Sequence, residues 1–214
     1  MSQPQPTVYI VDDDASFLAA TSRLLVASGF RAMTFESASE LIAHCTANVP
    51  GCIVADLQMP GLNGLELQSA LALTRNPLPI LFLTGNGDIA SSVRAMRGGA
   101  EDFLEKRAPK DALLDAVQRA LARDARERAE RERTQALKAR FEKLSVREKE
   151  VLAHVLQAQL NKQIAGDLAI NERTVKLHRT SIMAKLGVRS VMALTLLAQE
   201  AGMTPAEPTF PKGQ

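Results

Sequence analysis

The sequence predicts an α/β protein in which residues 1–122 form a five-stranded, doubly wound parallel sheet and an all-α, four-helix domain with a helix-turn-helix follows. Two observations predict this fold class. In the first part of the chain, short apolar runs rich in β-branched residues alternate with amphipathic helical segments, as in sheets covered by helices on both faces. Beyond residue 143, helical segments follow one another, separated by short breaks.

The predicted strands are short apolar runs that lie between turn residues. They comprise residues 7–11, 31–35, 52–55, 78–83 and 102–104. A helix is expected after each strand, and the first helix ends at Ser28 and Gly29, after apolar residues spaced three and four apart. Ser37 and Glu40 predict a capping box at the start of the second helix. The last helix of this domain is expected over residues 111–121.

Charge divides the chain into two unlike parts. Asp and Glu outnumber Lys and Arg by 13 to 9 in residues 1–122, whereas Lys and Arg outnumber Asp and Glu by 17 to 11 in residues 123–214. The basic second part suits a polyanionic partner. The chain starts without the pattern of a signal peptide, and no apolar run reaches the roughly 18 residues of a membrane span. We therefore expect a cytoplasmic protein with no membrane partner.

Residues 123–143 are rich in Ala, Arg and Glu and contain neither Gly nor Pro. These residues favour a helix, and opposite charges three or four residues apart stabilise one in water. The segment is predicted to be a charged helical linker. A continuation of the preceding helix that forms a dimer is the alternative. The tail, residues 202–214, contains several prolines and is expected to be disordered.

Polar side chains stand at the ends of four predicted strands. Asp12 and Asp13 follow the first strand, Asp56 the third, Thr84 the fourth and Lys106 the fifth. Because the carboxyl ends of parallel strands open on one edge of a sheet, we expect these five side chains to converge on a single pocket.

The chemistry of this pocket follows from its charges. Three neighbouring carboxylates repel one another unless a cation joins them, and Mg²⁺ takes oxygen ligands while leaving room for a phosphate. Asp56 can then act as a carboxylate nucleophile that carries an acyl phosphate. The ammonium of Lys106 and the hydroxyl of Thr84 suit phosphoryl oxygens. The pocket is therefore predicted to accept a phosphoryl group.

Four segments of residues 7–122 form a specific pattern: Val11-Asp12-Asp13-Asp14, Asp56-Leu57-Gln58-Met59-Pro60-Gly61, Leu83-Thr84-Gly85 and Asp102-Phe103-Leu104-Glu105-Lys106. In these segments the chain resembles the receiver domain of two-component response regulators. The resemblance implies that Asp56 is the phosphoacceptor. The metal ligands it implies are Asp13, Asp56, the Gln58 carbonyl and, through a metal-bound water, Asp12. It also implies that Thr84 and Lys106 contact the phosphoryl group and that Phe103 rotates inward when Thr84 moves.

One residue departs from the receiver pattern. Proline usually follows the lysine in this family, often after a cis peptide bond, but Arg107 stands there in this chain. A cis bond before a residue other than proline costs roughly 2.5–4 kcal/mol, so a trans bond and a shifted loop are expected. Lys106 is then expected to be aimed differently.

Residues 144–201 are predicted to form four helices. Ser145 and Glu148 give the start signal of the first, Asn171 caps a helix over residues 172–186 that Gly187 ends, and Ser190 caps the last. A short helix beginning at residue 161 and the helix over residues 172–186 make up the helix-turn-helix. Helical periodicity turns Val175, Ile182 and Leu186 toward the domain core. The opposite stripe, free to enter a major groove of DNA, carries Arg173, Lys176, Leu177 and Thr180.

A second pattern is formed by Leu144-Ser145, Arg147-Glu148, Glu150-Val151-Leu152, Asn161-Lys162, Ile164-Ala165, Thr174-Val175-Lys176, His178, Lys185-Leu186 and Val188. Over about residues 142–201 the chain thereby resembles the LuxR-type domain of the NarL/FixJ class of response regulators. The resemblance implies that Lys176, Leu177 and Thr180 face bases. It places near phosphates Lys162, Thr174, His178, Arg179 and Lys185. Ala158 departs from the pattern, which usually has glycine before the Asn-Lys pair, so a longer or helical turn is expected there.

Together these patterns predict a DNA-binding transcriptional response regulator and not an enzyme. A sensor histidine kinase would donate phosphate to Asp56, and phosphorylated receivers would form a homodimer that binds an inverted repeat in double-stranded DNA. Arg107 motivates a first alternative, a phosphate-independent DNA-binding regulator with a degenerate receiver. A Mg²⁺-dependent phosphohydrolase using an aspartyl phosphate is the second. It would place its nucleophile at the first strand end and a further acidic motif late in the fold, whereas Gly87-Asp88 has no acid near it before Glu101.

Overall fold

The computed structural model describes residues 5–44, 49–74, 77–85 and 89–203. The Gly87-Asp88 pair and the predicted tail beyond Met203 lie outside the described residues. The chain forms two compact units, Met1–Arg128 and Ala129–Gln214, and each is described by itself.

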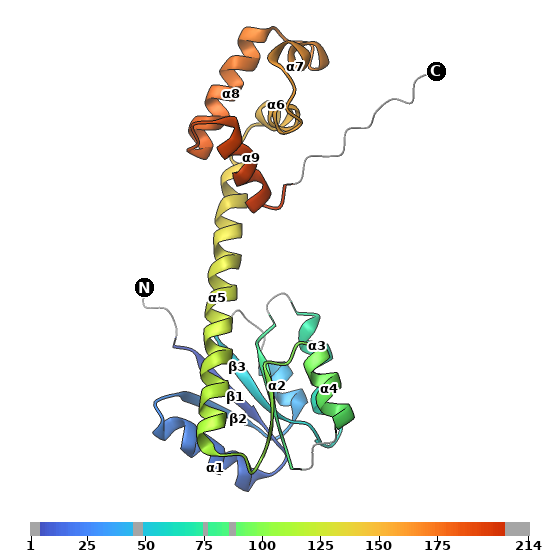
Figure 1. Cartoon of the computed structure of the whole chain (residues 1–214), viewed down its shortest axis with the longest axis vertical. Helices are drawn as coiled ribbons and strands as arrows, with labels where there is room; N and C mark the ends of the chain where they lie inside the picture. The colour runs from blue at the N-terminus through green and yellow to red at the C-terminus, as the bar shows by residue number, and fades with distance from the viewer. Residues whose placement is uncertain (1–4, 45–48, 75–76, 86–88, 204–214) are drawn as a thin grey trace, which may run out of the picture. The chain divides into compact units, whose positions relative to one another are not determined.

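The N-terminal unit contains the predicted five-stranded parallel sheet, with helices packed around it (Figure 1). Its strand order is β2-β1-β3-β4-β5. Its strands are β1 (Thr7–Val11), β2 (Arg31–Phe35), β3 (Gly51–Asp56), β4 (Ile80–Thr84) and β5 (Asp102–Glu105). β3 is one residue longer at each end than the predicted third strand. The fourth starts two residues later than predicted because Pro79 has no amide hydrogen to give to the ladder, although its carbonyl accepts the Ile53 N–H at 2.8 Å.

Helices cover both faces of the sheet, and successive strand residues point to opposite faces. Val8 and Ile10 of β1 belong to one core with α1 (Ala15–Ala27) and the first turns of α5 (Lys110–Glu142). Tyr9 and Val11 belong to the other core, with α2 (Ala38–His44), α3 (Gly64–Ala72) and α4 (Ile89–Arg97). β1, β3 and β4 are buried along their whole length, and this two-sided burial explains why most of their residues are apolar.

One helix cap differs from its prediction. The Ser37 hydroxyl accepts the Glu40 N–H at 3.3 Å, as expected for the start of α2. The Glu40 carboxylate, however, accepts the N–H of Glu36 at 3.2 Å instead of that of Ser37, so the reciprocal half of the predicted capping box is formed one residue earlier.

Helix α5 is 33 residues long and is continuous through the predicted linker, residues 123–143. Within the N-terminal unit, the buried carboxylate of Asp124 accepts the Gly51 N–H at 2.9 Å and pairs with Arg128. Within the C-terminal unit, Leu137 and Phe141 are core residues. The segment is therefore helical, as predicted, but both of its ends pack on a core, and no break in the helix marks a linker.

The C-terminal unit contains α6 (Val146–Leu156), α7 (Asn161–Asp167), α8 (Glu172–Leu186) and α9 (Val191–Glu200). The predicted caps are present: Ser145 with Glu148 forms a capping box, and the side chains of Asn171 and Ser190 accept backbone N–H groups of α8 and α9. Among the described residues no single helix is long and apolar enough to cross a membrane. Helices α8 and α9 meet those limits only when counted together, with a bend of 54° between them.

Two turns of this unit hold alanines in the left-handed region, Ala158 at φ 58° and Ala169 at φ 51°. Both follow the end of a helix in a Schellman arrangement. After α6, the Ala158 N–H bonds to the Val155 carbonyl at 3.0 Å and the Gln159 N–H to the His154 carbonyl at 3.2 Å. The turn after α6 is therefore a tight cap, and the expectation of a longer or helical turn at Ala158 was wrong.

Candidate functional sites

The five polar residues expected at one edge of the sheet stand at the carboxyl ends of their strands. Asp12 directly follows β1, Asp56 is the last residue of β3, and Thr84 is the last residue of β4. The β1–β3 register pairs Val11 with Ala55, so Asp12 and Asp56 are neighbours. Asp12, Asp56 and Thr84 are buried, at 1%, 7% and 1% exposure. Buried carboxylates need a cation or hydrogen-bond donors as partners, and Lys106 at the same sheet edge supplies a cation.

Lys106 brings the two buried acids together. Its Nζ lies 2.6 Å from Asp12 Oδ2 and 2.9 Å from Asp56 Oδ2. The remaining oxygens face backbone donors: Asp12 Oδ1 accepts the Asp14 N–H at 3.0 Å, and Asp56 Oδ1 accepts the Gln58 N–H at 3.2 Å. The predicted convergence is thus present for these residues. The expectation of a differently aimed Lys106 finds no counterpart, because its ammonium enters the pocket.

The balance of burial and charge in the pocket favours an additional cation. Burial raises the pKa of Asp12 even though hydrogen bonds from Lys106 and the Asp14 N–H oppose that rise. Burial alone would lower the pKa of Lys106, but its hydrogen bonds to Asp12 and Asp56 raise it, so the ammonium is kept. One ammonium therefore only partly compensates the carboxylates that surround it.

The acid cluster has the donor set of a hard divalent cation. Asp12, Asp13 and Asp56 each offer a carboxylate oxygen, and these oxygens lie within 4.8 Å of one another. Asp13 is exposed and faces solvent, whereas the other two are buried. Oxygen ligands from a few carboxylates, with open positions on the solvent side, suit Mg²⁺.

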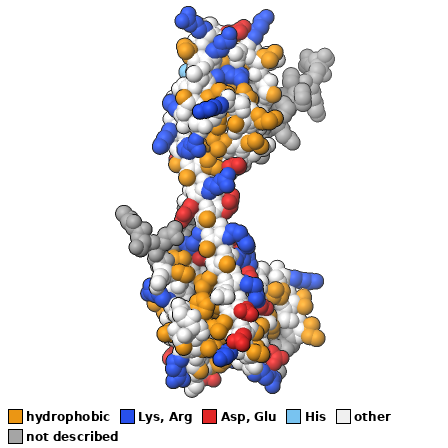
Figure 2. Space-filling view, turned by 60° about the vertical axis from the view of Figure 1, so that its left-hand side comes forward, with side chains coloured by type: hydrophobic (Ala, Val, Ile, Leu, Met, Phe, Trp, Pro, Cys, Tyr) orange, Lys and Arg blue, Asp and Glu red, His pale blue; other side chains and the backbone are white. Residues whose placement is uncertain are grey.

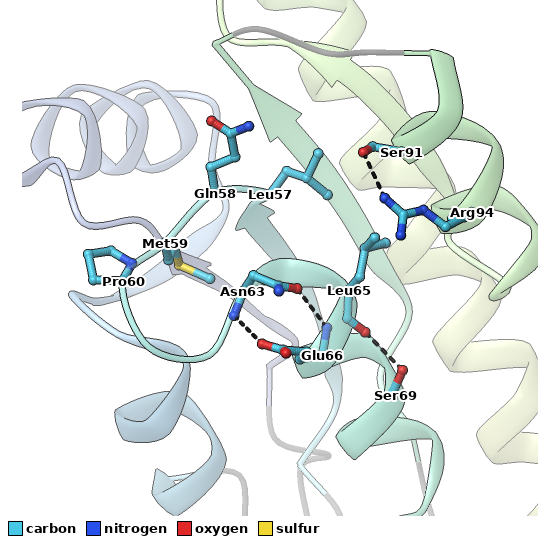
Figure 3. A pocket seen from close by; sticks show the side chains of 10 residues that line it. All are labelled: Leu57, Gln58, Met59, Pro60, Asn63, Leu65, Glu66, Ser69, Ser91 and Arg94. Carbon is cyan, nitrogen blue, oxygen red and sulfur yellow. Dashed lines mark hydrogen bonds between the residues drawn. The ribbon is translucent and has the colours of Figure 1, made fainter.

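The loop after Asp56 is held by packing and by a helix cap. A β-carbon on Gly64 would lie 2.6 Å from the backbone oxygen of Asp56, so only glycine lets α3 start this close to the strand end. Asn63 and Glu66 form a reciprocal capping box at the start of α3. Figure 3 shows both bonds on the wall of a cavity of about 680 Å³ between this loop, α3 and α4; the Gln58 side chain projects away from them.

The Lys106 turn has a trans backbone, as predicted from Arg107, since the described residues contain no cis peptide bond. The Lys106 N–H bonds to the Thr84 carbonyl and the Ala108 N–H to the Glu105 carbonyl, both at 2.8 Å. The Arg107 side chain is 80% exposed and pairs with Glu105. Phe103 is half-buried on β5, with its ring centroid 6.4 Å from that of Phe82.

The second candidate site is the exposed stripe of α8. Val175, Ile182 and Leu186 are buried, as periodicity predicted. Exposed side chains occupy the opposite stripe, and Leu177 keeps 64% of its surface accessible. The stripe comprises Arg173, Lys176, Leu177 and Thr180. On the face drawn in Figure 2, Lys and Arg side chains predominate over Asp and Glu on the C-terminal unit.

Several residues predicted to contact DNA already have partners within the unit. Arg179 donates to the Asn161 side chain at 2.9 Å, which ties α8 to the start of α7. The Thr174 and Thr180 hydroxyls donate to Asn171 Oδ1 and to the Lys176 carbonyl. Lys162 is exposed and His178 is half-buried. The contacts of these residues with DNA remain predictions.

Lys185 has a structural role that sequence reasoning missed. Its Nζ lies 2.8 and 2.7 Å from the two carboxylate oxygens of Glu148, a buried residue of α6 that also accepts the Ser181 hydroxyl at 2.6 Å. Hydrogen bonds from Lys185, Ser181 and the Ser145 N–H lower the pKa of Glu148 to about 2. The capping-box spacing indicated Glu148 as a cap, but nothing in the sequence indicated a bond to a residue 37 positions away.

Sequence reasoning also missed a contact between Lys106 and Phe17 of α1. Asp14 caps α1 by accepting the Ser16 and Phe17 N–H groups at 2.8 and 3.1 Å. Phe17 then lies under the Lys106 ammonium, with Nζ 4.6 Å from its ring centroid. A ring among apolar helix positions gave no signal of this contact.

Comparisons with known proteins agree with this geometry. The response regulator receiver domain family matches residues 8–118, and the bacterial regulatory proteins of the luxR family match residues 142–198. Nodulation protein W of Bradyrhizobium diazoefficiens is 41% identical over 198 residues, which cover 92% of this chain and 87% of that protein. The transcriptional regulatory protein FixJ of the same organism is 36% identical over 197 residues, covering 92% and 96%.

A solved structure extends the likeness to three dimensions. The response regulator StyR is 44% identical to this chain and superposes with a TM-score of 0.79, covering 92% of this chain and 99% of that chain. An acid pocket at the edge of a parallel sheet and a helix-turn-helix unit thus occur together in one chain. This chain therefore belongs to the two-component response regulators that combine a receiver domain with a LuxR-type DNA-binding domain.

Proposed function

We propose that this response regulator is switched by phosphoryl transfer from a sensor histidine kinase to Asp56, and that the phosphorylated form dimerises and binds an inverted repeat in DNA. The contact of Lys106 with both Asp12 and Asp56 supports the first step most strongly, because it brings side chains from three separate strand ends together at one place.

The transfer exchanges one bond to phosphorus for another. A carboxylate oxygen of Asp56 attacks the phosphorus of a phosphohistidine; the P–O bond forms as the P–N bond breaks, and the imidazole nitrogen recovers its electron pair and then a proton from water. The Lys106 ammonium, which donates to Asp56 Oδ2 in the structure, binds one phosphoryl oxygen and offsets its charge. The Thr84 hydroxyl donates to a second phosphoryl oxygen.

The carboxylate oxygens of Asp12, Asp13 and Asp56 fit Mg²⁺. Asp13 and Asp56 would bind the ion directly, Asp12 through a metal-bound water, and the family resemblance adds the Gln58 carbonyl as a further ligand. Mg²⁺ bound there supplies positive charge that reduces repulsion between the carboxylates and an incoming phosphoryl group. Asp13 holds the solvent side, and Asp12 acts from the buried side.

The phosphoryl group adds about −1.5 to −2 charges and three acceptor oxygens next to Thr84. Thr84 moves toward it, and Phe103, half-buried at the adjacent strand, turns inward. The changed surface of the receiver forms the homodimer. Two DNA-binding units then act together, since linking them raises the effective concentration of the second.

In the DNA complex, the exposed stripe of α8 enters the major groove. Lys176, Leu177 and Thr180 contact bases. Phosphates are contacted by Lys162, Thr174, His178, Arg179 and Lys185. The regulator works in the cytoplasm, where it meets both the kinase and the chromosome.

The test of the acceptor is the Asp56→Asn variant. Incubated with acetyl phosphate and Mg²⁺, the wild-type chain is expected to gain one phosphate by intact-mass spectrometry, and the variant none. Asp115→Asn, a change at an exposed carboxylate of α5, is the matched control and should be phosphorylated like wild type. A variant that still gains a phosphate, or a wild-type chain that gains none, would contradict the proposal.

The second candidate function is the phosphate-independent regulator, favoured by Arg107. It keeps the DNA contacts and drops the phosphoryl switch. Wild-type protein that takes up no phosphate, yet binds its DNA site as a dimer, would establish this alternative.

A further inference from the structure

We propose that Phe17 is a positioning residue for phosphoryl transfer: its ring holds the Lys106 ammonium in place when the carboxylates turn to other partners. This inference rests on the proposed function, since it concerns the lysine that meets the phosphoryl group. It arises from a contact with a residue of α1 that lies outside the four receiver motif segments.

The backbone near Lys106 gives its long side chain little guidance. The Lys106 N–H is tied to the Thr84 carbonyl, but the next residue, Arg107, is largely exposed and turns its side chain to Glu105. The position of the ammonium therefore depends on what its head group touches. A lysine side chain that loses its partners regains up to about 2 kcal/mol of rotamer entropy, which favours leaving the pocket.

Three contacts hold the ammonium in the structure: Asp12 at 2.6 Å, Asp56 at 2.9 Å, and the Phe17 ring at 4.6 Å. The first two are the carboxylates expected to bind the cation and to carry the phosphate. Both change their charge or their partner during the reaction. The ring has no such second task, so its attraction for a cation persists through every stage.

Phe17 is itself held in place. Asp14 Oδ1 accepts its N–H at 3.1 Å, which fixes the first turn of α1, and the ring packs against the core that α1 shares with α5. Lys106 is 21% exposed, so water screens the contact only in part. A partly desolvated cation–π pair at this distance is expected to change a rate by about two- to tenfold.

The experiment compares full-length Phe17→Leu and Phe17→Tyr, because Leu keeps an apolar side chain and Tyr keeps the aromatic face. With acetyl phosphate and Mg²⁺, Phe17→Leu should phosphorylate Asp56 about two- to tenfold more slowly than wild type. Phe17→Tyr should restore the rate. Leu24 lines the same cavity as Phe17 and Lys106, but its aliphatic side chain offers no aromatic face to the ammonium. Leu24→Ala is therefore the matched control and should leave the rate unchanged.

A double-mutant cycle shows whether Phe17 acts through Lys106. In a Lys106→Met background, Phe17→Leu should have no further effect on the rate. An equal loss in both backgrounds would mean that Phe17 serves packing alone, and would overturn the inference. If wild type accepts phosphate and Phe17→Leu accepts it at the same rate, the inference would also be overturned. This result would leave the proposed function standing.

Nuclear magnetic resonance gives a readout besides activity. In metal-free wild-type protein, the Lys106 Hε protons should be shifted upfield by the Phe17 ring current, and the shift should vanish in Phe17→Leu and return in Phe17→Tyr. Unshifted protons in wild type would overturn the inference even if the rates differ. A wild-type chain with the shift but without phosphate uptake would instead contradict the proposed function.

Discussion

The acid pocket and the exposed stripe of α8 are built in opposite ways. The pocket takes side chains from four strand ends, buries Asp12, Asp56 and Thr84, and joins the two acids through Lys106. The stripe comes from one helix and turns its side chains outward. Contacts between its own side chains fix the geometry of a site that holds one small group. A surface that binds DNA must instead leave its side chains accessible to the partner. Long-range contacts between side chains therefore shape the acid pocket, whereas exposure on one helix shapes the α8 stripe.

Lys185 gives the strongest test of this comparison, because it was predicted to contact DNA but pairs with the buried Glu148. Lys185→Met is expected to lower the free energy of unfolding of the C-terminal unit by about 3 kcal/mol, because it leaves the buried Glu148 carboxylate without its cation. Lys149→Met, at an exposed position of α6, should change it little. Urea unfolding followed by circular dichroism measures both. A Lys185→Met protein that keeps its stability and loses only DNA affinity would show that Lys185 acts in DNA binding and not in folding.

The same ion pair predicts a pH dependence. The pKa of Glu148 is about 2 in the folded chain and near 4.5 without its partners, so its stabilisation is present above pH 4.5 and is lost as the pH falls toward 2. The urea midpoint of the C-terminal unit should therefore drop between pH 5 and about pH 2. Lys185→Met should flatten that drop, and an unchanged slope would contradict the role given to the pair.

Gly64 measures how closely the pocket is packed. Gly64→Ala would force a β-carbon to within 2.6 Å of the Asp56 carbonyl and 2.8 Å of the Phe82 ring. We expect about 1–3 kcal/mol of lost stability and slower phosphorylation, because Asp56 must shift. Gly166→Ala, where a β-carbon meets open space, is the control. Equal melting temperatures for Gly64→Ala and wild type would show that the strand end yields freely.

Two residues of α8 are expected to contribute to DNA binding in different ways, one through bases and one through phosphates. Lys176→Ala should weaken binding by about 1–3 kcal/mol and relax base preference, because Lys176 is exposed on the stripe that we propose enters the major groove. Arg179→Ala should weaken binding to all sequences alike, since Arg179 lies beside Asn161 at the edge of the motif. Affinities for the specific site and for random DNA measure the difference. Equal losses on both DNAs for both variants would remove the division.

The turn at Ala158 holds an alanine in the left-handed region. Ala158→Gly should stabilise the C-terminal unit by about 1 kcal/mol, because glycine adopts the left-handed region without the steric cost that a β-carbon carries. Ala153→Gly, at an exposed position inside α6, should destabilise it by a similar amount. Thermal melts of the two variants should therefore move in opposite directions; a shift in the same direction would contradict the cap geometry.

Local patterns predicted most of the fold because the forces that form it are local. Strand composition located β1 and β2 to the residue, and cap residues such as Ser145, Asn171 and Ser190 marked where helices begin. Strand ends also predicted which side chains would meet at the sheet edge. Periodicity assigned the buried and exposed sides of α8, because a helix repeats every 3.6 residues whatever surrounds it.

Partners far apart in the sequence could not be predicted in this way. The bonds of Lys185 to Glu148 and of Asp124 to Gly51, and the seat of Lys106 on Phe17, depend on how elements pack. The expected misaiming of Lys106 illustrates the limit: it followed from the local backbone at Arg107, whereas the position of the ammonium is decided by side chains on β1, β3 and α1.

We propose that phosphate on Asp56 controls DNA binding by the other unit. The most direct measurement compares DNA affinity and dimer fraction of the full chain with and without acetyl phosphate and Mg²⁺, with Asp56→Asn in parallel. The expected result is tighter DNA binding and more dimer for phosphorylated wild type, and no response from the variant. Equal affinity and equal dimer fraction in phosphorylated and unphosphorylated wild type would contradict the claim.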